Sequence, residues 1–300
     1  MLRFCSFSSG SSGNCYLVRT DRTALLVDAG IPLKRIREGL EMTATPEETV
    51  AAVLITHEHS DHIRSIGALT GSRGLKRPAA TTDAECEVGC PAEPNAEGAT
   101  TGGAAEPLPV YANRETWDAI AELPFFAECP IPGKRICDFA EPFVIGDITV
   151  EPFHLSHDAA AAMGYSFVAD GRRITVVTDT GVITDEIREK ARNADLLVLE
   201  ANHDVDMLRI GGYPWFLKQR ILGCYGHLSN DTAAELVCDL LREGTAPKTV
   251  ALAHLSKQNN FPEMAWQTLA NAVEEAGFVI GRDLEVRILV RDTISEVFTV

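Results

Sequence analysis

The chain has 300 residues, of which 45% are hydrophobic and 23% are charged, as in an ordinary soluble globular protein. This length accommodates one large domain or two modest ones with a substantial core. No apolar run approaches the ~18 residues of a membrane-spanning helix, and the first residues lack the basic and apolar segments of a signal peptide. We therefore expect a cytoplasmic protein with no membrane partner and with free cysteine thiols.

The charge is strongly acidic, with 27 Lys and Arg residues against 43 Asp and Glu residues, which gives a net charge of −16. Phosphates attract Lys and Arg, so a uniformly acidic chain binds nucleic acid poorly unless it has a specific site. The charge argues against a protein that coats DNA in bulk. It leaves room for an enzyme with a local basic groove.

Short strands and turns alternate along the first quarter of the chain. A Ser- and Gly-rich turn at 8–14 separates the first two apolar segments, and Pro32 starts a short helix. An apolar run at 51–55 is typical of a buried strand. In chain order we expect strands at 2–7, 15–18 and 24–27, a helix at 32–40, a strand at 51–55 and a helix at 63–69.

The stretch from about 81 to 109 differs from the rest, because it is rich in Ala, Gly, Pro and Thr and has six acidic residues and no Lys or Arg. Such a composition builds no core, so we expect an acidic low-complexity surface insertion in a single domain that spans 1–300. Its Cys86 and Cys90 are interpreted as free thiols rather than a zinc site, because their spacing lacks a partner pair.

The second half repeats strand and helix patterns. The predicted strands lie at 148–153, 164–169, 174–178, 196–199 and 249–253, the predicted helices at 184–192, 230–242 and 262–276, and two strands end the chain. Strands in both halves with helices between them indicate an α+β fold. We expect two packed mixed β-sheets flanked by helices.

The most informative segment is 57–62, which reads HEHSDH and directly follows the apolar run at 51–55. On an extended segment, His57 and His59 point to the same side. Asp61 and His62, where the chain turns into a helix, can face a second ion close by. Neutral imidazole and carboxylate are the usual ligands of zinc, manganese and iron. The spacing therefore predicts a metal site at the end of this strand.

This HxHxDH pattern after a strand resembles the signature of the metallo-β-lactamase superfamily, whose αββα sandwich holds one or two metals at the sheet edges. The resemblance covers nearly the whole chain outside 81–109. It implies a third His after a later strand, for which His157 is chosen because it precedes the Gly-Tyr pair at 164–165, with His154 as the alternative. It also implies a bridging carboxylate, Asp179, and a last ligand, His254, each at a strand end.

The resemblance implies two divalent ions, one on His57, His59 and His157 and the other on Asp61, His62 and His254, with Asp179 between them. Two such ions would lower the pKa of a shared water and hold a phosphate oxygen. The nucleophile is then a metal-bound hydroxide that Asp61 orients and that attacks phosphorus, so Cys224 is not needed as a nucleophile. Zinc suits the His-rich set best, and manganese or iron also tolerate the carboxylates.

Two further positions narrow the reaction. Glu200 follows an apolar strand in LEANHD, and His227 precedes a helix in GHLSN. In phosphodiesterase branches of the superfamily, including the tRNA 3′-processing enzymes, a Glu at this position orients a His that protonates the leaving oxygen. An alkoxide is a poor leaving group and needs that proton. His203 is either a further contact of this site or a structural histidine.

The motifs together resemble the YycJ/WalJ-type branch, and they are SSGSSGN, HEHSDH, SHDA, TDTG, EANHD, GHLSN and HLSKQNN. That resemblance implies a cytoplasmic single-domain nuclease, a DNA exonuclease of 5′-to-3′ polarity. The alternative is a hydrolase of a small ester, thioester or cyclic phosphodiester on the same scaffold. A metal-binding module without catalysis is disfavoured, because every ligand position and the Glu200–His227 pair are filled. The sequence decides neither the native metal nor the oligomeric state.

Candidate substrate contacts flank these motifs. The turn at 8–14 exposes backbone N–H groups to an anion, or is only a turn. The segment 212–220 interleaves aromatic and basic residues, as single-strand binders do, or it is an amphipathic helix with Trp215 and Phe216 in the core. Residues 257–260 grip phosphate or cap the next helix. The candidates are Ser11, Ser12, Asn14, Lys218, Arg220, Ser229, Asn230, Lys257 and Asn259.

Overall fold

A computed structural model describes residues 1–71, 74–75, 107–127, 131–139 and 141–300. The predicted insertion, with Cys86 and Cys90, lies almost entirely outside these residues. Among the described cysteines, Cys5, Cys15, Cys224 and Cys238 are free thiols. In the part of the chain that is described, no helix combines the length and the hydropathy of a membrane span.

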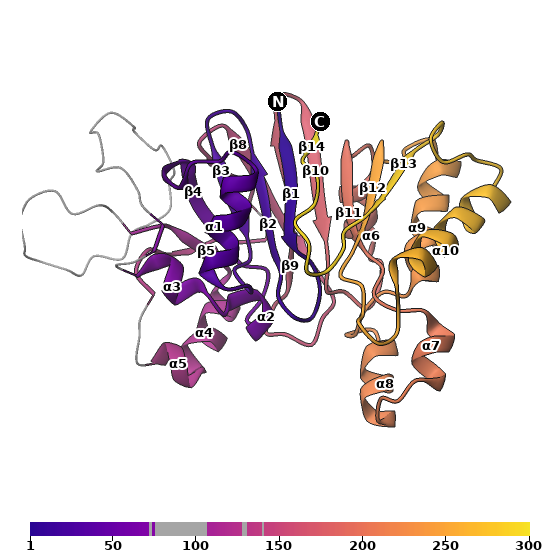
Figure 1. Ribbon diagram of the computed structural model, residues 1–300, viewed down its shortest axis with the longest axis horizontal. Coiled ribbons are helices and arrows are strands. Elements are labelled where there is room, and N and C mark those ends of the chain that lie inside the picture. Colours follow the sequence, from indigo (N-terminus) through magenta and orange to yellow (C-terminus); the bar gives the residue numbers. More distant parts are fainter. Residues whose placement is uncertain (72–73, 76–106, 128–130, 140) are drawn as a thin grey trace, which may run out of the picture.

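Two mixed β-sheets pack face to face, each with seven described strands (Figure 1). The first sheet has the order β14 (Phe298–Thr299), β1 (Arg3–Ser8), β2 (Cys15–Arg19), β3 (Ala24–Val27), β4 (Val50–Leu54), β5 (Val110–Ala112) and β6 (Lys134–Ile136). The second has the order β13 (Glu285–Ile288), β12 (Thr249–Ala253), β11 (Leu196–Glu200), β10 (Arg172–Val177), β9 (Met163–Ala169), β8 (Ile148–His154) and β7 (Phe143–Ile145).

Both sheets have the same pairing pattern. In the first sheet, β14, β1, β2 and β3 pair antiparallel, and β3 to β6 pair parallel. In the second, β7 to β10 pair antiparallel, and β10 to β13 pair parallel. The carboxyl ends of each parallel set therefore open on one edge, which is where ligand sites of such sheets form.

The central strands of each sheet are buried on both faces, whereas edge strands such as β6 are exposed. In β3, Leu25 and Val27 enter the core between the sheets, whereas Ala24 and Leu26 pack toward the outer helices. A strand that is covered on both sides needs apolar residues at every position, which is why the sequence shows continuous apolar runs instead of alternation.

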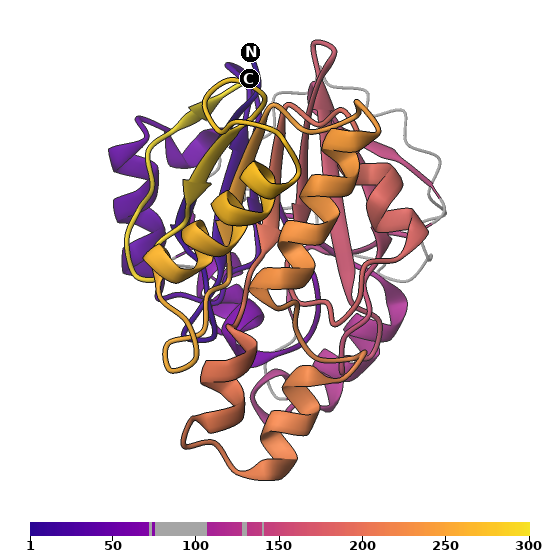
Figure 2. The same ribbon diagram turned by 90° about the vertical axis from the view of Figure 1, so that its right-hand side faces the viewer.

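Helices cover the outer faces and one end of the sandwich (Figures 1 and 2). Ile36 and Leu40 of α1 (Leu33–Met42) pack on the first sheet. On the second sheet lie α6 (Asp185–Ala191), α9 (Asn230–Arg242) and α10 (Pro262–Glu275). The remaining helices are α2 (Ser60–Ile63), α3 (Ile66–Thr70), α4 (Arg114–Glu122), α5 (Pro124–Ala127), α7 (Val205–Ile210), α8 (Trp215–Leu222) and a 3-10 turn, η1 (Glu47–Thr49).

The predicted fold of two mixed sheets between helices is confirmed, and most predicted elements agree with the structure within two residues. The helix predicted over 63–69 is instead two short helices, α2 and α3, and the first begins at Ser60, inside the HEHSDH motif. The sequence did not predict β5, β6 or β7, because strands of three residues at one side of a sheet are too short to show a period.

Candidate metal centre

Five polar side chains follow strands at the same edge of the sandwich. Asp28 comes after β3, His57 after β4, Asp179 after β10, and His254 after β12, while Glu200 ends β11. These strands belong to the two parallel sets, so their carboxyl ends bring the side chains together. All five are at most 2% exposed.

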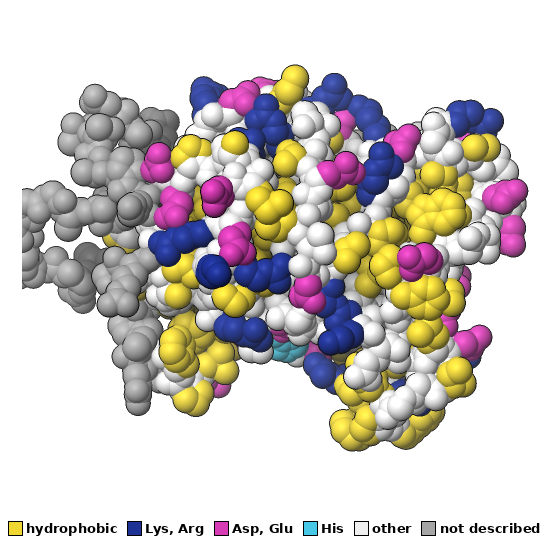
Figure 3. Space-filling view, viewed as in Figure 1, with side chains coloured by type: hydrophobic (Ala, Val, Ile, Leu, Met, Phe, Trp, Pro, Cys, Tyr) yellow, Lys and Arg dark blue, Asp and Glu magenta, His cyan; other side chains and the backbone are white. Residues whose placement is uncertain are grey.

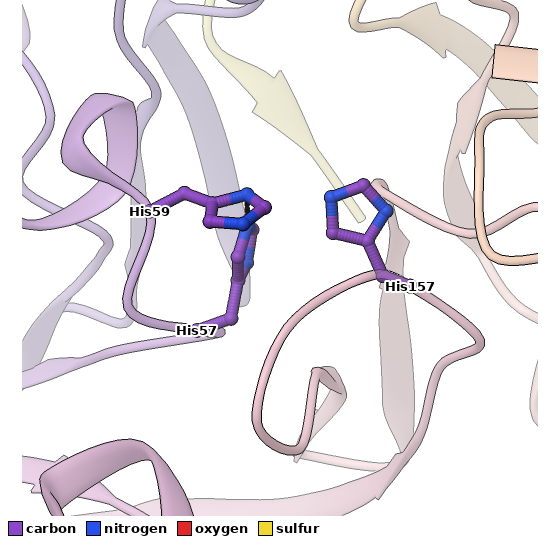
Figure 4. A group of neighbouring side chains, drawn as sticks. All are labelled: His57, His59 and His157. Atoms are coloured by element: carbon purple, nitrogen blue, oxygen red, sulfur yellow. Dashed lines mark hydrogen bonds between the residues drawn. The ribbon is translucent and has the colours of Figure 1, made fainter. Parts of the chain in front are cut away.

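Three histidines form one group, in which the rings of His57 and His59 lie side by side and His157 faces them from another loop (Figure 4). Nε2 of His57 lies 3.1 Å from Nδ1 of His59. Nδ1 of His157 donates to the carbonyl of Gly226 at 3.0 Å, which leaves Nε2, 3.3 Å from Oδ1 of Asp158, as the nitrogen that could bind a metal. One ligand atom from each residue lies within 4.8 Å of the others.

The alternative histidine, His154, lies outside this group. Its side chain is 63% exposed, its Nδ1 is 3.3 Å from Glu186, and its ring stacks on Phe139. Of the two candidates that the sequence left open, the structure brings only His157 to the other histidines.

Asp61, His62 and His254 form a second group, also with ligand atoms within 4.8 Å. Nδ1 of His62 donates to Asp28 at 2.8 Å, and Nδ1 of His254 donates to Glu200 at 2.9 Å. A carboxylate on one ring nitrogen fixes the tautomer and directs the other nitrogen to a metal. Burial opposes charge on the His62 ring, but Asp28 and Asp179 outweigh it and raise the pKa of His62 to about 10.

Asp179 lies between the groups. Its Oδ1 is 3.4 Å from Nε2 of His254, and its Oδ2 is 3.6 Å from Nε2 of His62. Burial opposes charge on this carboxyl, but the surrounding imidazoles, His254 foremost, hold the pKa of Asp179 well below its usual range.

Two of these facing atoms, Oδ2 of Asp179 and Nε2 of His254, are buried and have no hydrogen-bond partner in the described part of the chain. Buried polar atoms are normally paired. Orphaned carboxylate and imidazole atoms in the same buried cluster fit the ligands of a divalent metal ion.

The backbone is strained at three of these positions. Asp28, Asp179 and His254 have φ angles of 62°, 65° and 55°, in the left-handed region that residues other than glycine rarely adopt. Each such residue costs roughly 1–2 kcal/mol. Because all three directly follow strands or strand ends, the left-handed turn aims their side chains into the centre, and such strain concentrates at functional sites.

Glu200 connects the centre to His227. One carboxylate oxygen accepts from Nδ1 of His227 at 2.8 Å and from Nδ1 of His254 at 2.9 Å. The other oxygen accepts from the backbone N–H groups of Thr180 and Leu228. Burial alone would raise the pKa of Glu200, but the two histidines, His227 foremost, lower it to about 2.

His227 has the opposite shift. Burial disfavours its charged ring, but the Glu200 carboxylate outweighs burial and raises the pKa of His227 to about 9. Its side chain is 19% exposed, and no described residue is hydrogen-bonded to Nε2. The pair that the sequence predicted is therefore hydrogen-bonded, and one ring nitrogen is available at the surface of the site. The bond from His254 to the same carboxylate was not predicted.

The sequence reasoning missed Asp28. Its carboxylate accepts from the N–H and hydroxyl of Thr56 as well as from His62, so it fixes the start of the HEHSDH segment. The available signal was its place directly after the apolar strand 24–27, as Asp179 directly follows another strand.

Of the predicted substrate contacts, four are exposed and five are buried. The exposed ones are Ser11, Ser12, Arg220 and Lys257, and the buried ones are Asn14, Lys218, Ser229, Asn230 and Asn259. The buried residues have internal partners. Nδ2 of Asn14 lies 3.0 Å from Nε2 of His62, and Nζ of Lys218 donates to the carbonyl of Arg209 at 2.6 Å.

The remaining buried candidates shape the loops. Ser229 caps α9 by accepting from the N–H of Thr232, and Asn230 exchanges side-chain hydrogen bonds with Asn260. Asn259 bonds to Ser256. Ser12 is hydrogen-bonded to Asp292 and stays exposed. Of the buried candidates, Asn14 is hydrogen-bonded to a site histidine, and the others hold loops and helix ends.

The aromatic segment is a helix, but its aromatic residues are not core. Trp215 and Phe216 are 67% and 73% exposed at the start of α8. The interpretation that they belong to the core is therefore wrong, because no described element covers this side of the short helix.

His203, in contrast, is 1% exposed, and both of its ring nitrogens lack partners among the described residues. Burial lowers the pKa of His203 to about 4. It is thus a neutral, buried ring behind Glu200.

The sandwich and the His–Asp cluster at its edge define a metallo-β-lactamase-fold protein. The model of the beta-lactamase superfamily domain matches residues 23–254. Exodeoxyribonuclease WalJ of Streptococcus pneumoniae is 36% identical over 284 residues, which cover 95% of this chain and 93% of that protein. Exodeoxyribonuclease YycJ of Bacillus anthracis is 36% identical over 285 residues, with coverage of 95% and 94%.

Among solved structures, the metallo-beta-lactamase fold protein YhfI from Bacillus subtilis matches with a TM-score of 0.65 at 18% identity, and the match covers 99% of this chain and 100% of that one. At this identity the match shows a shared fold. The chain belongs to the beta-lactamase superfamily and, within it, to the family that contains WalJ and YycJ.

Proposed function

We propose that the protein is a dinuclear metal-dependent phosphodiesterase that degrades DNA from an end in the 5′-to-3′ direction. The observation that carries the proposal is the Glu200–His227 pair, hydrogen-bonded at 2.8 Å directly beside the histidine and aspartate groups. Hydrolysis of a phosphodiester expels an alkoxide, which needs a proton donor at this place. The family relatives WalJ and YycJ, which are named exodeoxyribonucleases, support DNA as the substrate.

The proposed ligands divide as the geometry groups them. His57, His59 and His157 would hold one ion, Asp61, His62 and His254 the other, and Asp179 both. Two divalent ions held there would supply an acidified water and neutralise charge on the phosphate. Zinc is the ion that best suits the histidine-rich donor set, and manganese and iron fit the carboxylates.

The remaining steps belong to side chains of this chain. Glu200 is the buried anion that keeps Nδ1 of His227 occupied, so that Nε2 gives its proton to the leaving oxygen of the sugar. Asp61, whose side chain is 21% exposed, orients the attacking water. Asp28 and Glu200 fix the rings of His62 and His254 from behind.

The test is a panel of 5′- and 3′-end-labelled single- and double-stranded DNA, RNA and small esters, assayed with zinc or manganese and with a chelator. We expect nucleotide release from DNA that starts at the 5′ end, stops with the chelator and returns when metal is added. Turnover of small esters without any cleavage of DNA would contradict the proposal and favour the small-ester hydrolase.

A further inference from the structure

Helices α7 and α8 form a hairpin, residues 205–226, that projects beyond the sheets at the end of the sandwich where α2 lies (Figures 1 and 2). We infer that this hairpin is a stacking platform for the bases of an unpaired DNA strand whose end reaches the metal centre. The inference rests on the proposed function and specifies its substrate as DNA with a single-stranded terminus.

The outer surface of the hairpin is apolar and uncovered. Ile210 is 86% exposed, Trp215 67%, Phe216 73% and Tyr225 63%. The hydrophobic side chains gather at the tip of the projection in Figure 3. Exposed apolar groups that gather in this way indicate a binding surface, and aromatic rings bind bases of any sequence by stacking.

The base of the hairpin is hydrogen-bonded to the loops that hold the site histidines. The N–H of His227 donates to the carbonyl of Ile221 at 3.0 Å, and the carbonyl of Gly226 accepts from the ring of His157 at 3.0 Å. The carbonyl of Cys224 accepts from Ser156. A strand bound on the hairpin is therefore held at a fixed offset from the proposed leaving-group acid.

The charge near the hairpin has the sign that a phosphate backbone requires. Residues 205–226 contain three basic residues and a single acid, Asp206, although the whole chain carries −16. Of the three, Lys218 is buried, while Arg209 and Arg220 are exposed and pair with Asp206 and Asp158. Around the centre, Arg64 donates to Ser12, Arg291 donates to the carbonyl of Leu255, and exposed Lys257 comes soon after His254. Figure 3 shows Lys and Arg side chains on both sides of the histidine that is visible at the mouth.

These charges and rings favour an unpaired strand over other occupants. In a duplex, base faces are stacked on each other and closed to Trp215 and Phe216. A second copy of this chain would bring two basic hairpins and two acidic bodies together. A single strand offers both open base faces and phosphates.

The test compares the Trp215→Ala/Phe216→Ala double variant with the wild type and with Trp266→Ala, a partly exposed tryptophan on α10. Binding is measured by fluorescence anisotropy with phosphorothioate oligothymidylates of about 20 and about 3 nucleotides, which resist cleavage. We expect the double variant to lose roughly 10- to 100-fold in affinity for the longer oligonucleotide. Its affinities for the longer and the shorter oligonucleotide should then be similar. The Trp215→Phe/Phe216→Tyr variant, which keeps two aromatic rings, should restore the affinity for the longer oligonucleotide. Metal content and thermal unfolding show whether each variant is folded.

Equal affinity of the double variant and the wild type for the longer oligonucleotide would overturn the stacking-platform inference. It would leave the proposed DNA-degrading function untouched. A wild-type dimer that the double variant converts to a monomer would also overturn the inference and identify the surface as an interface between copies. If the wild type binds the oligonucleotide with the expected length dependence but cleaves no DNA, the proposed function fails and the platform is retained.

Discussion

The two halves of the molecule contribute to the metal centre in different ways. The first half supplies His57, His59, Asp61 and His62 from six consecutive residues that run from the loop after β4 into α2. The second half supplies its groups one at a time, from loops and strand ends far apart in the sequence, and they are His157, Asp179, Glu200, His227 and His254. The two sheets have the same pairing pattern, but the first half contributes ligands from one short motif, and the second half brings together residues that are far apart in sequence.

Each half also provides a buried carboxylate that is hydrogen-bonded to histidine, but the two carboxylates bind different numbers of histidines. Asp28 holds His62 and the start of the motif. Glu200 holds His254 and His227 with one oxygen, so it joins a proposed metal ligand to the proposed proton donor. Under the proposed function, Glu200 in the second half would couple metal binding to proton transfer, whereas Asp28 in the first half would only orient a ligand.

The largest effect is expected at Asp179, which approaches ligands from both halves. Asp179→Asn tolerates the left-handed backbone but removes the charge between two cations. We expect loss of at least one ion per chain and about a 10⁴-fold or greater loss of hydrolysis, because the ions supply several kcal/mol of transition-state stabilisation. Metal analysis and DNA cleavage measure both. Asp170→Asn, at an exposed turn with φ of 51°, is the matched control, and two ions with full turnover in Asp179→Asn would refute the bridging role.

His227→Ala removes the proton donor and leaves every proposed ligand in place. Hydrolysis of DNA should fall by roughly 10²–10⁴-fold, the usual contribution of general acid catalysis. Bis-p-nitrophenyl phosphate should lose far less, since its phenolate leaves without a proton. Rates on the two substrates, together with metal content, decide the question. An equal loss on both would assign His227 to orienting metal or substrate.

Glu200→Gln should slow DNA cleavage less than His227→Ala does, but it should also weaken metal binding. Glu200 accepts four hydrogen bonds, and a Gln side chain would place a donor against one pair of donors. We expect roughly 10- to 100-fold weaker metal binding, because mutating the hydrogen-bond partner of a metal-binding histidine such as His254 usually costs this much. DNA cleavage should be slower as well. Metal titration checks this, with Glu151→Gln, a carboxylate paired with Arg173 and Lys190 away from the centre, as control. Undisturbed metal affinity would show that His254 does not depend on Glu200.

Asp28→Asn should have the smallest effect. We expect metal affinity to fall by roughly tenfold through the loosened His62 ring, and the ratio of rates on DNA and bis-p-nitrophenyl phosphate to stay as in the wild type. The two substrates assayed at saturating metal test this. A changed ratio would mean that the first half also takes part in proton transfer, and the contrast between the halves would fail.

The sequence by itself determined most of the fold and the local half of the centre. Strands buried on two faces require continuous apolar runs, and those runs are readable without a structure. The six residues of HEHSDH contain four potential ligands, three histidines and one aspartate, so spacing alone indicates a metal. The ligands of the second half followed only from resemblance to a family, because nothing local marks Asp179 or His254 as neighbours of His57.

Only the tertiary structure decided which polar groups meet and which side chains are covered. The pairing of Asp28 with His62, and the sharing of Glu200 between His227 and His254, depend on strands that are adjacent in the sheets and distant in sequence. Lys218 was predicted to contact substrate and is bonded inside the hairpin, while Trp215 and Phe216 are exposed. On a short helix the sequence gives the side chains, but whether they are buried depends on what packs against that helix.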